Sequence, residues 1–496
     1  MQQHNGVSTI LGMDRYALPR FRSEEEVKTS SEVSTNKQLK KNIDFEDDKF
    51  LSKAVLDKLT HYLTLLLLAL VVWSLLWSTW GAGWAWGGPW FRVVAVPLAG
   101  WAAGEALHEL TTLPPLLAAL LTGILARNLG ILDMRQHLYI DGLLRKVYPV
   151  GILGKASLGW NLGFMTSNWR QVAPLGILPW TAEVTTLAIC THYFLDFPWL
   201  WGFLLGTIYS SVSCPVIMMP VVKHAQGCSR NWVQLVCTAG GLDTGLSVGV
   251  YGTIFSFIFI NANQSYKYVK AALTLFAGCA LGTIWGSIAK FVPSPADTYV
   301  SELRVLFVFL GGLAGNVLTG QVGWLGTGVI AVLACNATAA HHWAKTGWKI
   351  NDNPASRAYR AIWSTLEPIV FTYTGTFFVM DGTMTETMLL GFAILLICLT
   401  VRLTVTFFSC WSIPVRERLF ICCAWSPKSI VEAVLSPMAL SMVLTRDGFS
   451  DLERQTAERH VQLIVQAILI TTPIGYLLTN HLGPKLLEKD KTIVNR

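Results

Sequence analysis

The chain has 496 residues, of which 52% are hydrophobic and 14% are charged, and its formal net charge is +7. Apolar windows of roughly 20 residues, the length of a helix that crosses a hydrocarbon core, recur along most of the chain. This composition excludes a soluble fold and predicts an all-α polytopic membrane protein. The charge is spread over loops and tails without a basic and aromatic patch, so we expect contact with the lipid bilayer and no nucleic-acid partner.

The predicted elements begin after a polar segment. Residues 1–53 are mixed in charge and rich in Ser, Lys and Glu, which predicts a disordered cytosolic tail. A transmembrane domain is expected at 54–484, and a short cytosolic tail at 485–496. Hydropathy predicts about fourteen spans in this domain. They lie near 59–77, 90–107, 113–130, 143–165, 173–194, 199–220, 233–261, 271–291, 303–318, 323–341, 358–380, 387–410, 417–443 and 458–482.

The distribution of basic residues predicts the orientation. An even number of spans places both termini on one side of the membrane, and the short loops expected on that side carry lysine and arginine. The positive-inside rule therefore favours cytosolic termini, in the plasma membrane or an endomembrane. The basic residues concerned are Lys223, Arg230, Lys345, Lys349, Arg357, Arg416 and Arg418.

One carboxylate, Asp243, lies inside an apolar run that extends to Asn261. No water solvates a charge at that depth, and an ionisable residue at the centre of a spanning helix costs roughly 2.5–3.5 kcal/mol on insertion scales. Chains keep such residues mainly where they function or are paired, so Asp243 is the first candidate for ion or proton binding. The alternative is an aspartate that only locks helix packing through a buried hydrogen bond.

Two further charges lie within predicted spans. Glu183 is in the fifth span and Arg402 is in the twelfth, and each needs a partner inside the membrane. Pairing the two residues satisfies both, so we predict a structural ion pair, with a functional role as the alternative. Lys155, near the end of the fourth span, is predicted to extend its ammonium group toward the membrane interface.

Two predicted spans carry signs of a break in the helix. The sixth reads S-S-V-S-C-P-V-I-M-M-P and contains Ser213 and Pro215. The thirteenth reads A-W-S-P-K-S-I-V-E-A-V-L-S-P and contains Pro427 and Lys428. Proline has no backbone N–H and clashes with the preceding turn, so both spans are predicted to be broken.

The positions of these broken spans predict a repeat. The sixth and thirteenth spans are seven apart, as are the spans of Glu183 and Arg402, and an odd offset inverts the second copy, as in an inverted-topology repeat. Paired broken helices predict a substrate site near the membrane midplane, because half-helix ends direct their dipoles at a bound ion. Lys428 directly follows Pro427 at such a break, where we expect it to pair with Asp243 in the empty site.

Several stretches together resemble one family. The sequence reads L-P-P-L-L-A-A-L-L-T-G-I-L-A-R-N at 113–128, H-Y-F-L-D-F-P-W-L-W-G-F-L-L-G at 192–206, A-W-S-P-K at 424–428 and T-T-P-I-G-Y-L-L at 471–478. These segments are similar to those of the cation/proton antiporters, and within them to the animal sodium/hydrogen exchanger subfamily (solute carrier family 9, subfamily B type).

This resemblance implies a fold and a set of site residues. The fold would have two inverted repeats with crossing broken helices, and a core domain (about 173–261 and 387–482) that moves against a dimerisation domain in a homodimer. Glu183 and Arg402 would form the family's buried ion pair, and Lys428 would face the ion site. Asp243 would be the first of two adjacent aspartates, but this chain has Thr244 where the family has its principal ion-binding carboxylate.

Three functions are therefore open. The first is a secondary active transporter that exchanges sodium, lithium or potassium for protons, with Asp243 binding each in turn and Thr244 offering a neutral oxygen. The second is a proton-coupled anion transporter, which Lys428 and the missing negative charge favour. The third is a transport-inactive scaffold or regulator.

Several expectations hold for all three of these functions. None is an enzyme, and none needs a cofactor. The absence of a Walker A motif argues against an ATP-driven pump. The ten cysteines lie mostly in apolar runs, which predicts no metal site beyond the transported cation.

Overall fold

The computed structural model describes residues 36–225, 228, 230–259, 264–294, 296–349, 353–380, 384–446 and 448–487. Over these ranges the regular secondary structure is helical and no β-strand forms, as the apolar pattern predicts. Residues 1–35 and 488–496, which hold most of the two predicted tails, lie outside the described residues.

The chain divides into two compact units, Met1–Ala95 and Val96–Arg496. In the first unit the long helix α2 (Asn36–Trp80) is followed by the short 3-10 helix η2 (Gly81–Trp84). Trp73 fixes this turn, because its indole N–H donates to the carbonyl of Trp84 at 2.8 Å. Because α2 begins at Asn36, part of the segment that we expected to be disordered is helical in the structure.

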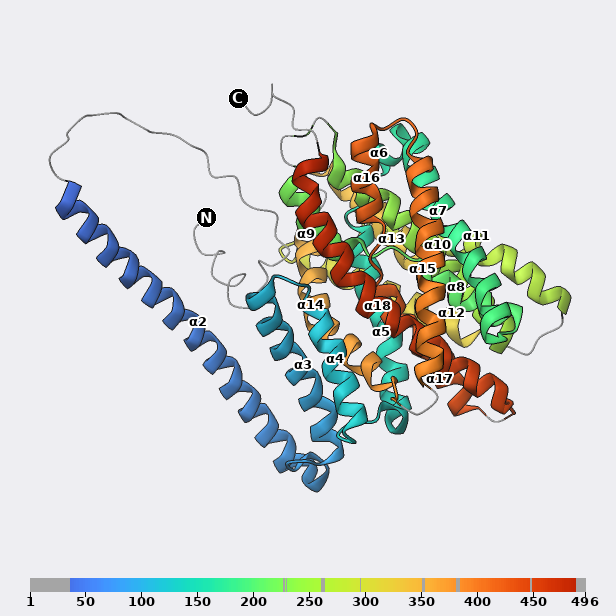
Figure 1. The fold of residues 1–496 in the computed structure, drawn as a ribbon, viewed down its shortest axis with the longest axis horizontal. Helices are drawn as coiled ribbons and strands as arrows, with labels where there is room; N and C mark the ends of the chain where they lie inside the picture. Colours follow the sequence, from blue (N-terminus) through green and yellow to red (C-terminus); the bar gives the residue numbers. More distant parts are fainter. Residues whose placement is uncertain are drawn as a thin grey trace. The chain divides into compact units, whose positions relative to one another are not determined.

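The helix α3 (Pro89–Thr111) begins in the first unit and continues into the second, which contains all the remaining helices (Figure 1). These are α4 (Leu116–Asn128), η3 (Met134–His137), α5 (Leu138–Ser157), α6 (Leu162–Ser167), α7 (Trp169–Leu195), α8 (Trp199–Tyr209), α9 (Cys214–His224), α10 (Trp232–Phe259), α11 (Gln264–Ile288), α12 (Val300–Gln321), α13 (Leu325–Lys345), α14 (Pro354–Thr376), α15 (Met384–Ser409), α16 (Val415–Ala424), α17 (Ile430–Thr445) and α18 (Asp451–Leu486).

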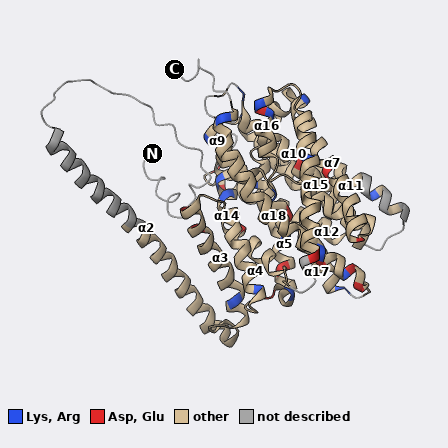
Figure 2. Cartoon of the chain, in the orientation of Figure 1, with Lys and Arg blue, Asp and Glu red and all other residues tan. Residues whose placement is uncertain are grey.

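Each of the predicted spans overlaps a helix of the structure, and the sixth and thirteenth spans, which were predicted to be broken, are each divided in two. In the described part of the chain, seven helical segments are long and apolar enough to cross a membrane. These segments are Leu59–Trp84, Trp169–Leu195, Trp199–His224, Trp232–Phe259, Val300–Gln321, Glu386–Ser409 and Asp451–Leu486. Long stretches of these helices carry no charged residue, as the tan ribbon in Figure 2 shows. The larger number of spans that hydropathy predicts stays a prediction.

The helices that flank the two broken spans pack in matching ways. In the first group (α7–α10), α10 contacts both α8 and α9. In the second group (α15–α18), α18 contacts both α16 and α17. The groups also contact each other, through α7 with α15, α9 with α18, and α10 with α17. A helix, a broken helix and a further helix thus occur twice in the same order, which is the arrangement that an inverted repeat predicts.

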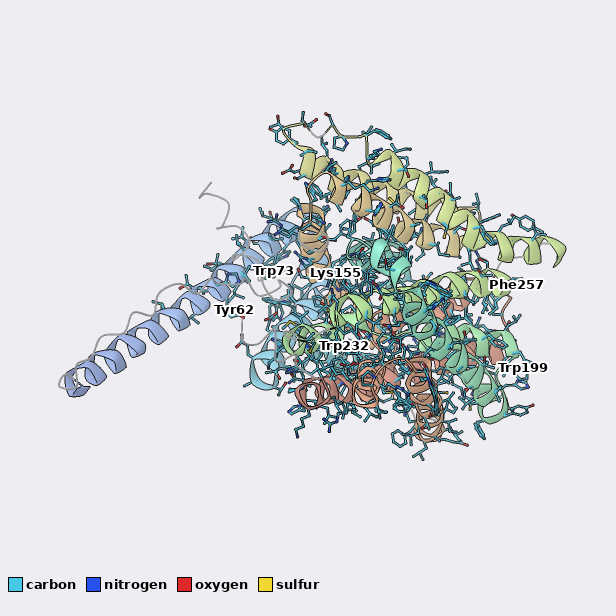
Figure 3. The ribbon with its side chains drawn as sticks, turned by 90° about the horizontal axis from the view of Figure 1, so that it is seen from above. Tyr62, Trp73, Lys155, Trp199, Trp232 and Phe257 are labelled. Atoms are coloured by element: carbon cyan, nitrogen blue, oxygen red, sulfur yellow. The ribbon has the colours of Figure 1, made fainter. Side chains whose placement is uncertain are left out.

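The helix α10 lies close to the first broken helix because of a glycine. A methyl group at Gly240 would overlap the sulfur of Cys214, in the first turn of α9. Figure 3 labels Trp232 and Phe257, which lie toward the two ends of α10. Asp243 is between them in sequence, so the close contact with α9 is beside the candidate carboxylate.

Candidate functional site

Both predicted breaks are present. The helix α8 ends at Tyr209 and α9 begins at Cys214 with Pro215 in its first turn, where the missing N–H of proline leaves no hydrogen bond unmade. The helix α16 ends at Ala424 and α17 begins at Ile430, with Pro427 in the non-helical segment between them. Each break leaves backbone N–H and C=O groups at the half-helix ends that need other partners.

The two breaks meet. The backbone N–H of Ser213 donates to the carbonyl of Pro427 at 3.0 Å. The hydroxyl of Ser213 donates to the hydroxyl of Ser429, also at 3.0 Å, and Ser429 is the N-cap residue of α17. Because these contacts join backbone and side chains of both interrupted segments, the broken helices cross at this point.

Arg402, on α15, makes contacts well beyond the predicted pair. Its guanidinium lies 2.6 Å from Glu183 on α7 and 3.0 Å from Asp243 on α10, and all three side chains are fully buried. It also donates to the carbonyls of Ser210, at 2.5 Å, and Trp425, at 2.8 Å. These two residues are the C-caps of α8 and α16, so one arginine satisfies the carbonyl ends of both half-helices.

Lys428 does not pair with Asp243 in this structure, contrary to our expectation. Its ammonium group lies 2.7 Å from Glu183 and donates to the carbonyl of Tyr209 at 2.5 Å. The reason is that Asp243 already has partners on both oxygens, whereas Glu183 receives Arg402 on Oε2 and leaves Oε1 for the lysine. Glu183 is therefore shared by two cations.

Asp243 links three elements. Its Oδ1 accepts the backbone N–H of Val212, in the first break, at 2.9 Å, and its Oδ2 accepts Arg402. Thr244 is the next residue on α10 and is half-buried, and within the described chain its hydroxyl makes no hydrogen bond. The structure therefore brings together Asp243 and the first break, and within the described chain Thr244 makes no hydrogen bond to the charged residues.

Sequence reasoning missed Glu432, which is buried near the start of α17 with 1% of its surface exposed. A sequence pattern that could have identified Glu432 was present, because Ser429 and Glu432 have the S-x-x-E spacing of a capping box. It also missed two threonines of α18 that hold the backbone of Lys428. Thr471 accepts its N–H at 3.1 Å, and the hydroxyl of Thr472 donates to its carbonyl at 2.5 Å.

Lys155 is half-buried on α5 and is labelled in Figure 3. Glu367, on α14, interacts with it electrostatically. Among the described residues, no group of three or more His, Cys, Asp and Glu side chains could hold a metal ion. The carboxylates Glu183 and Asp243 are instead held by arginine and lysine.

Comparisons with known proteins identify the family. A family model described as "Sodium/hydrogen exchanger, transmembrane" matches residues 93–480. The human protein "Sodium/hydrogen exchanger 9B2" is 28% identical over 447 residues, which cover 87% of this chain and 80% of that protein. The human protein "Sodium/hydrogen exchanger 9B1" is 26% identical over 386 residues, which cover 76% of this chain and 73% of that protein.

A solved structure is also similar. The sodium proton antiporter MjNhaP1 from Methanocaldococcus jannaschii matches with a TM-score of 0.62 at 14% sequence identity, over 79% of this chain and 97% of the antiporter. At this identity the match concerns the fold, and it confirms the all-α antiporter-like architecture that the sequence predicts.

Proposed function

Because the chain belongs to the transmembrane sodium/hydrogen exchanger family, we propose that it is an integral membrane transporter that exchanges a monovalent cation for protons by alternating access. The observation that carries this proposal is the position of Asp243. Its carboxylate is fully buried and lies at the first of two crossing half-helix breaks. A proton and a sodium, lithium or potassium ion would compete for the same oxygens, and this competition couples their movements.

The contacts of Asp243 give each neighbouring residue a role. Arg402 and the backbone N–H of Val212 stabilise the ionised carboxylate when no ion is bound. An arriving cation or proton would take over one of these contacts, while Glu183 keeps Arg402 in place. Glu183 and Arg402 thus act as the structural ion pair, and Lys428 acts as a second cation that stabilises Glu183.

The charges at the crossing favour cation over anion transport. Lys428, which suggested an anion, is paired with Glu183, and Arg402 is shared by Glu183 and Asp243. Glu432 adds a third carboxyl group to these two cationic side chains. A site with three acids and two paired bases offers no free positive charge to an anion.

The arrangement of the protein in the membrane is also part of the proposal. The helices α7–α10 and α15–α18 pack together, and the contacts of α11 with α13 and of α4 with α14 form other groups. This pattern supports a core domain that moves against a dimerisation domain in a homodimer. The basic residues of the short loops support cytosolic termini.

The test is a proteoliposome assay with an internal pH dye, in which sodium, lithium, potassium and chloride gradients are imposed in turn. We expect sodium, lithium or potassium to drive proton movement, and chloride to have no effect. Proton movement driven by chloride alone would support anion coupling. A reconstituted, folded protein that responds to none of the gradients would support a scaffold or regulator.

A further inference from the structure

The crossing contains a buried carboxyl, Glu432, that the ion pairs with Arg402 and Lys428 do not use. Its Oε2 accepts the backbone N–H of Ser429 at 3.0 Å. Its Oε1 is buried and has no hydrogen-bond partner within the described ranges. A buried carboxyl oxygen without a partner is costly, so this atom needs an explanation.

Helix capping accounts for the contact of one oxygen of Glu432, but not for its ionisable carboxyl group. In a capping box one oxygen of the residue at the third helical position accepts the N-cap N–H, and glutamine serves as well as glutamate. The same box begins α18, where Ser450 donates its N–H to Glu453 at 2.9 Å near the protein surface. The cap therefore requires an oxygen at Glu432, but not a group that binds a proton.

The helix α10 presents one face to α17. Tyr251 on α10 donates its hydroxyl to the carbonyl of Leu435 on α17 at 3.0 Å. Asp243 and Ser247 precede Tyr251 at intervals of four residues, which places all three on the same side of α10. The hydroxyl of Ser247 is buried and, over the residues described, has no hydrogen-bond partner.

The helix α17 has a matching pair of oxygens. Ser436 follows Glu432 by four residues, and its hydroxyl is also buried and unpaired among the described residues. Three titratable groups interact electrostatically with Glu432, namely Lys428 beside the second break, Asp243 on α10 and Tyr209 at the end of α8. Two carboxyls and two free hydroxyls thus belong to neighbouring helices at the crossing.

We propose that Glu432 is a second ion-binding carboxyl of the transport site, and that it acts with Asp243 and the free hydroxyls of Ser247 and Ser436. The inference rests on the proposed cation exchange and identifies the ligands for sodium or lithium. Such hard cations prefer carboxylate and other oxygen ligands. Protons would compete at both carboxyls, so binding of one cation would displace up to two protons.

The test compares Glu432→Gln with Glu453→Gln, which makes the same change in the capping box of α18, away from the crossing. Glutamine preserves both caps, so both variants should keep the parent's melting temperature in choline chloride. Two quantities are measured at several pH values: the rise in melting temperature caused by sodium or lithium chloride, and the cation KM of proton flux in proteoliposomes.

We expect the parent's KM to fall by up to about a hundredfold per pH unit at acidic pH, where two protons compete, and by about tenfold in Glu432→Gln. At alkaline pH the KM of Glu432→Gln should be about tenfold higher than that of the parent, because one ligand is lost. The rise in melting temperature should shrink in parallel, and Glu453→Gln should match the parent in both measurements.

The outcomes separate the two proposals. If Glu432→Gln matches the parent in KM, pH dependence and cation-induced stabilisation, Glu432 is only a cap and the exchange proposal stands. If the parent shows neither flux nor cation-induced stabilisation, both proposals fail. Stabilisation without flux in the parent, lost in Glu432→Gln, would support this site and refute exchange.

A second variant covers the case in which Glu432→Gln does not fold. Ser436→Ala removes an unpaired hydroxyl, so it should fold like the parent and raise the cation KM severalfold. An unchanged KM and an unchanged cation-induced stabilisation in Ser436→Ala, together with a misfolded Glu432→Gln, would overturn the inference.

Discussion

The guanidinium of Arg402 lies 3.0 Å from Oδ2 of Asp243, and both side chains are fully buried. The candidate carboxylate is thus neutralised by a fixed partner that is as fully buried as the carboxylate itself. An ion that binds Asp243 has to compete with this contact. Because Arg402 also contacts the ends of α8 and α16, occupancy of the carboxylate is connected to both broken helices.

The first prediction concerns Asp243→Asn. Asparagine keeps an oxygen for the N–H of Val212 but cannot hold a proton or a negative charge, so cation-driven proton movement should be abolished while the protein stays folded. Proteoliposome flux and gel filtration measure the two effects. Asp297→Asn, at an exposed loop position, is the control and should transport normally. Flux that persists in Asp243→Asn would refute the assignment.

The second prediction concerns the buried cluster around Arg402. Removing one partner of a buried ion pair costs about 3–5 kcal/mol, because it leaves an uncompensated charge. Glu183→Gln and Arg402→Met should each lower the melting temperature of the detergent-solubilised protein. Arg402 has two carboxylate partners, so the double variant should recover only part of the loss, and adding Asp243→Asn should recover more. Additive losses would show that the residues are not coupled.

The third prediction concerns Thr244→Asp, which tests the expectation from the sequence that Thr244 stands where the family has the second of two aspartates. A second carboxylate beside Asp243 would offer a cation more negative charge, so sodium or lithium exchange should appear or strengthen. The sodium and lithium dependence of proton flux measures the gain, and Thr244→Asn is the uncharged control. If Thr244→Asp folds but gains no sodium-driven or lithium-driven proton flux, Thr244 does not determine how strongly this chain responds to these cations.

The fourth prediction compares the two serines at the crossing. Ser213→Ala removes one hydrogen bond, which typically contributes about 0.5–1.5 kcal/mol. Ser429→Ala removes the same bond and also the N-cap of α17, whose loss costs about 0.5–2 kcal/mol more. Melting temperatures should therefore fall further for Ser429→Ala. Equal losses would indicate that the cap contributes little to stability.

The fifth prediction concerns Arg145 on α5, which contacts the second broken helix. It lies 2.6 Å from Asp141 and donates to the carbonyl of Val434 at 2.6 Å and to that of Ala433 at 3.3 Å. Pro437 has no N–H for the carbonyl of Ala433, so Arg145 and the hydroxyl of Thr374, which donates to the same carbonyl at 2.7 Å, together replace a missing helix bond.

Arg145→Met should therefore lower the melting temperature strongly, by the roughly 3–5 kcal/mol typical of an unpaired buried charge. Adding Asp141→Asn should restore part of the loss, because it removes the carboxylate left without a partner. If the double variant is as unstable as Arg145→Met alone, the contacts of Arg145 with the two carbonyls, rather than its ion pair with Asp141, stabilise the protein.

The sequence by itself determined the class of fold and the positions of the breaks. Long apolar segments can satisfy their backbone groups in a membrane only as helices. Prolines marked the two breaks, although other prolines lie inside continuous helices, namely Pro97, Pro149, Pro174, Pro179, Pro368 and Pro473. It also identified Asp243, Glu183 and Arg402, because a charge inside an apolar run is conspicuous without any knowledge of its neighbours.

The sequence predicted that Glu183 and Arg402 pair, but only the tertiary structure decided the other contacts of the buried charges. Arg402 and Glu183 are 219 residues apart, and the expected pairing of Lys428 with Asp243 was wrong because the crossing of the breaks places its ammonium group beside Glu183. Glu432 was not singled out from the sequence, and its free oxygen became visible only when α17 was packed against its neighbours. Hydropathy and proline act locally along the chain, whereas ion pairing depends on distances between helices, which packing alone sets.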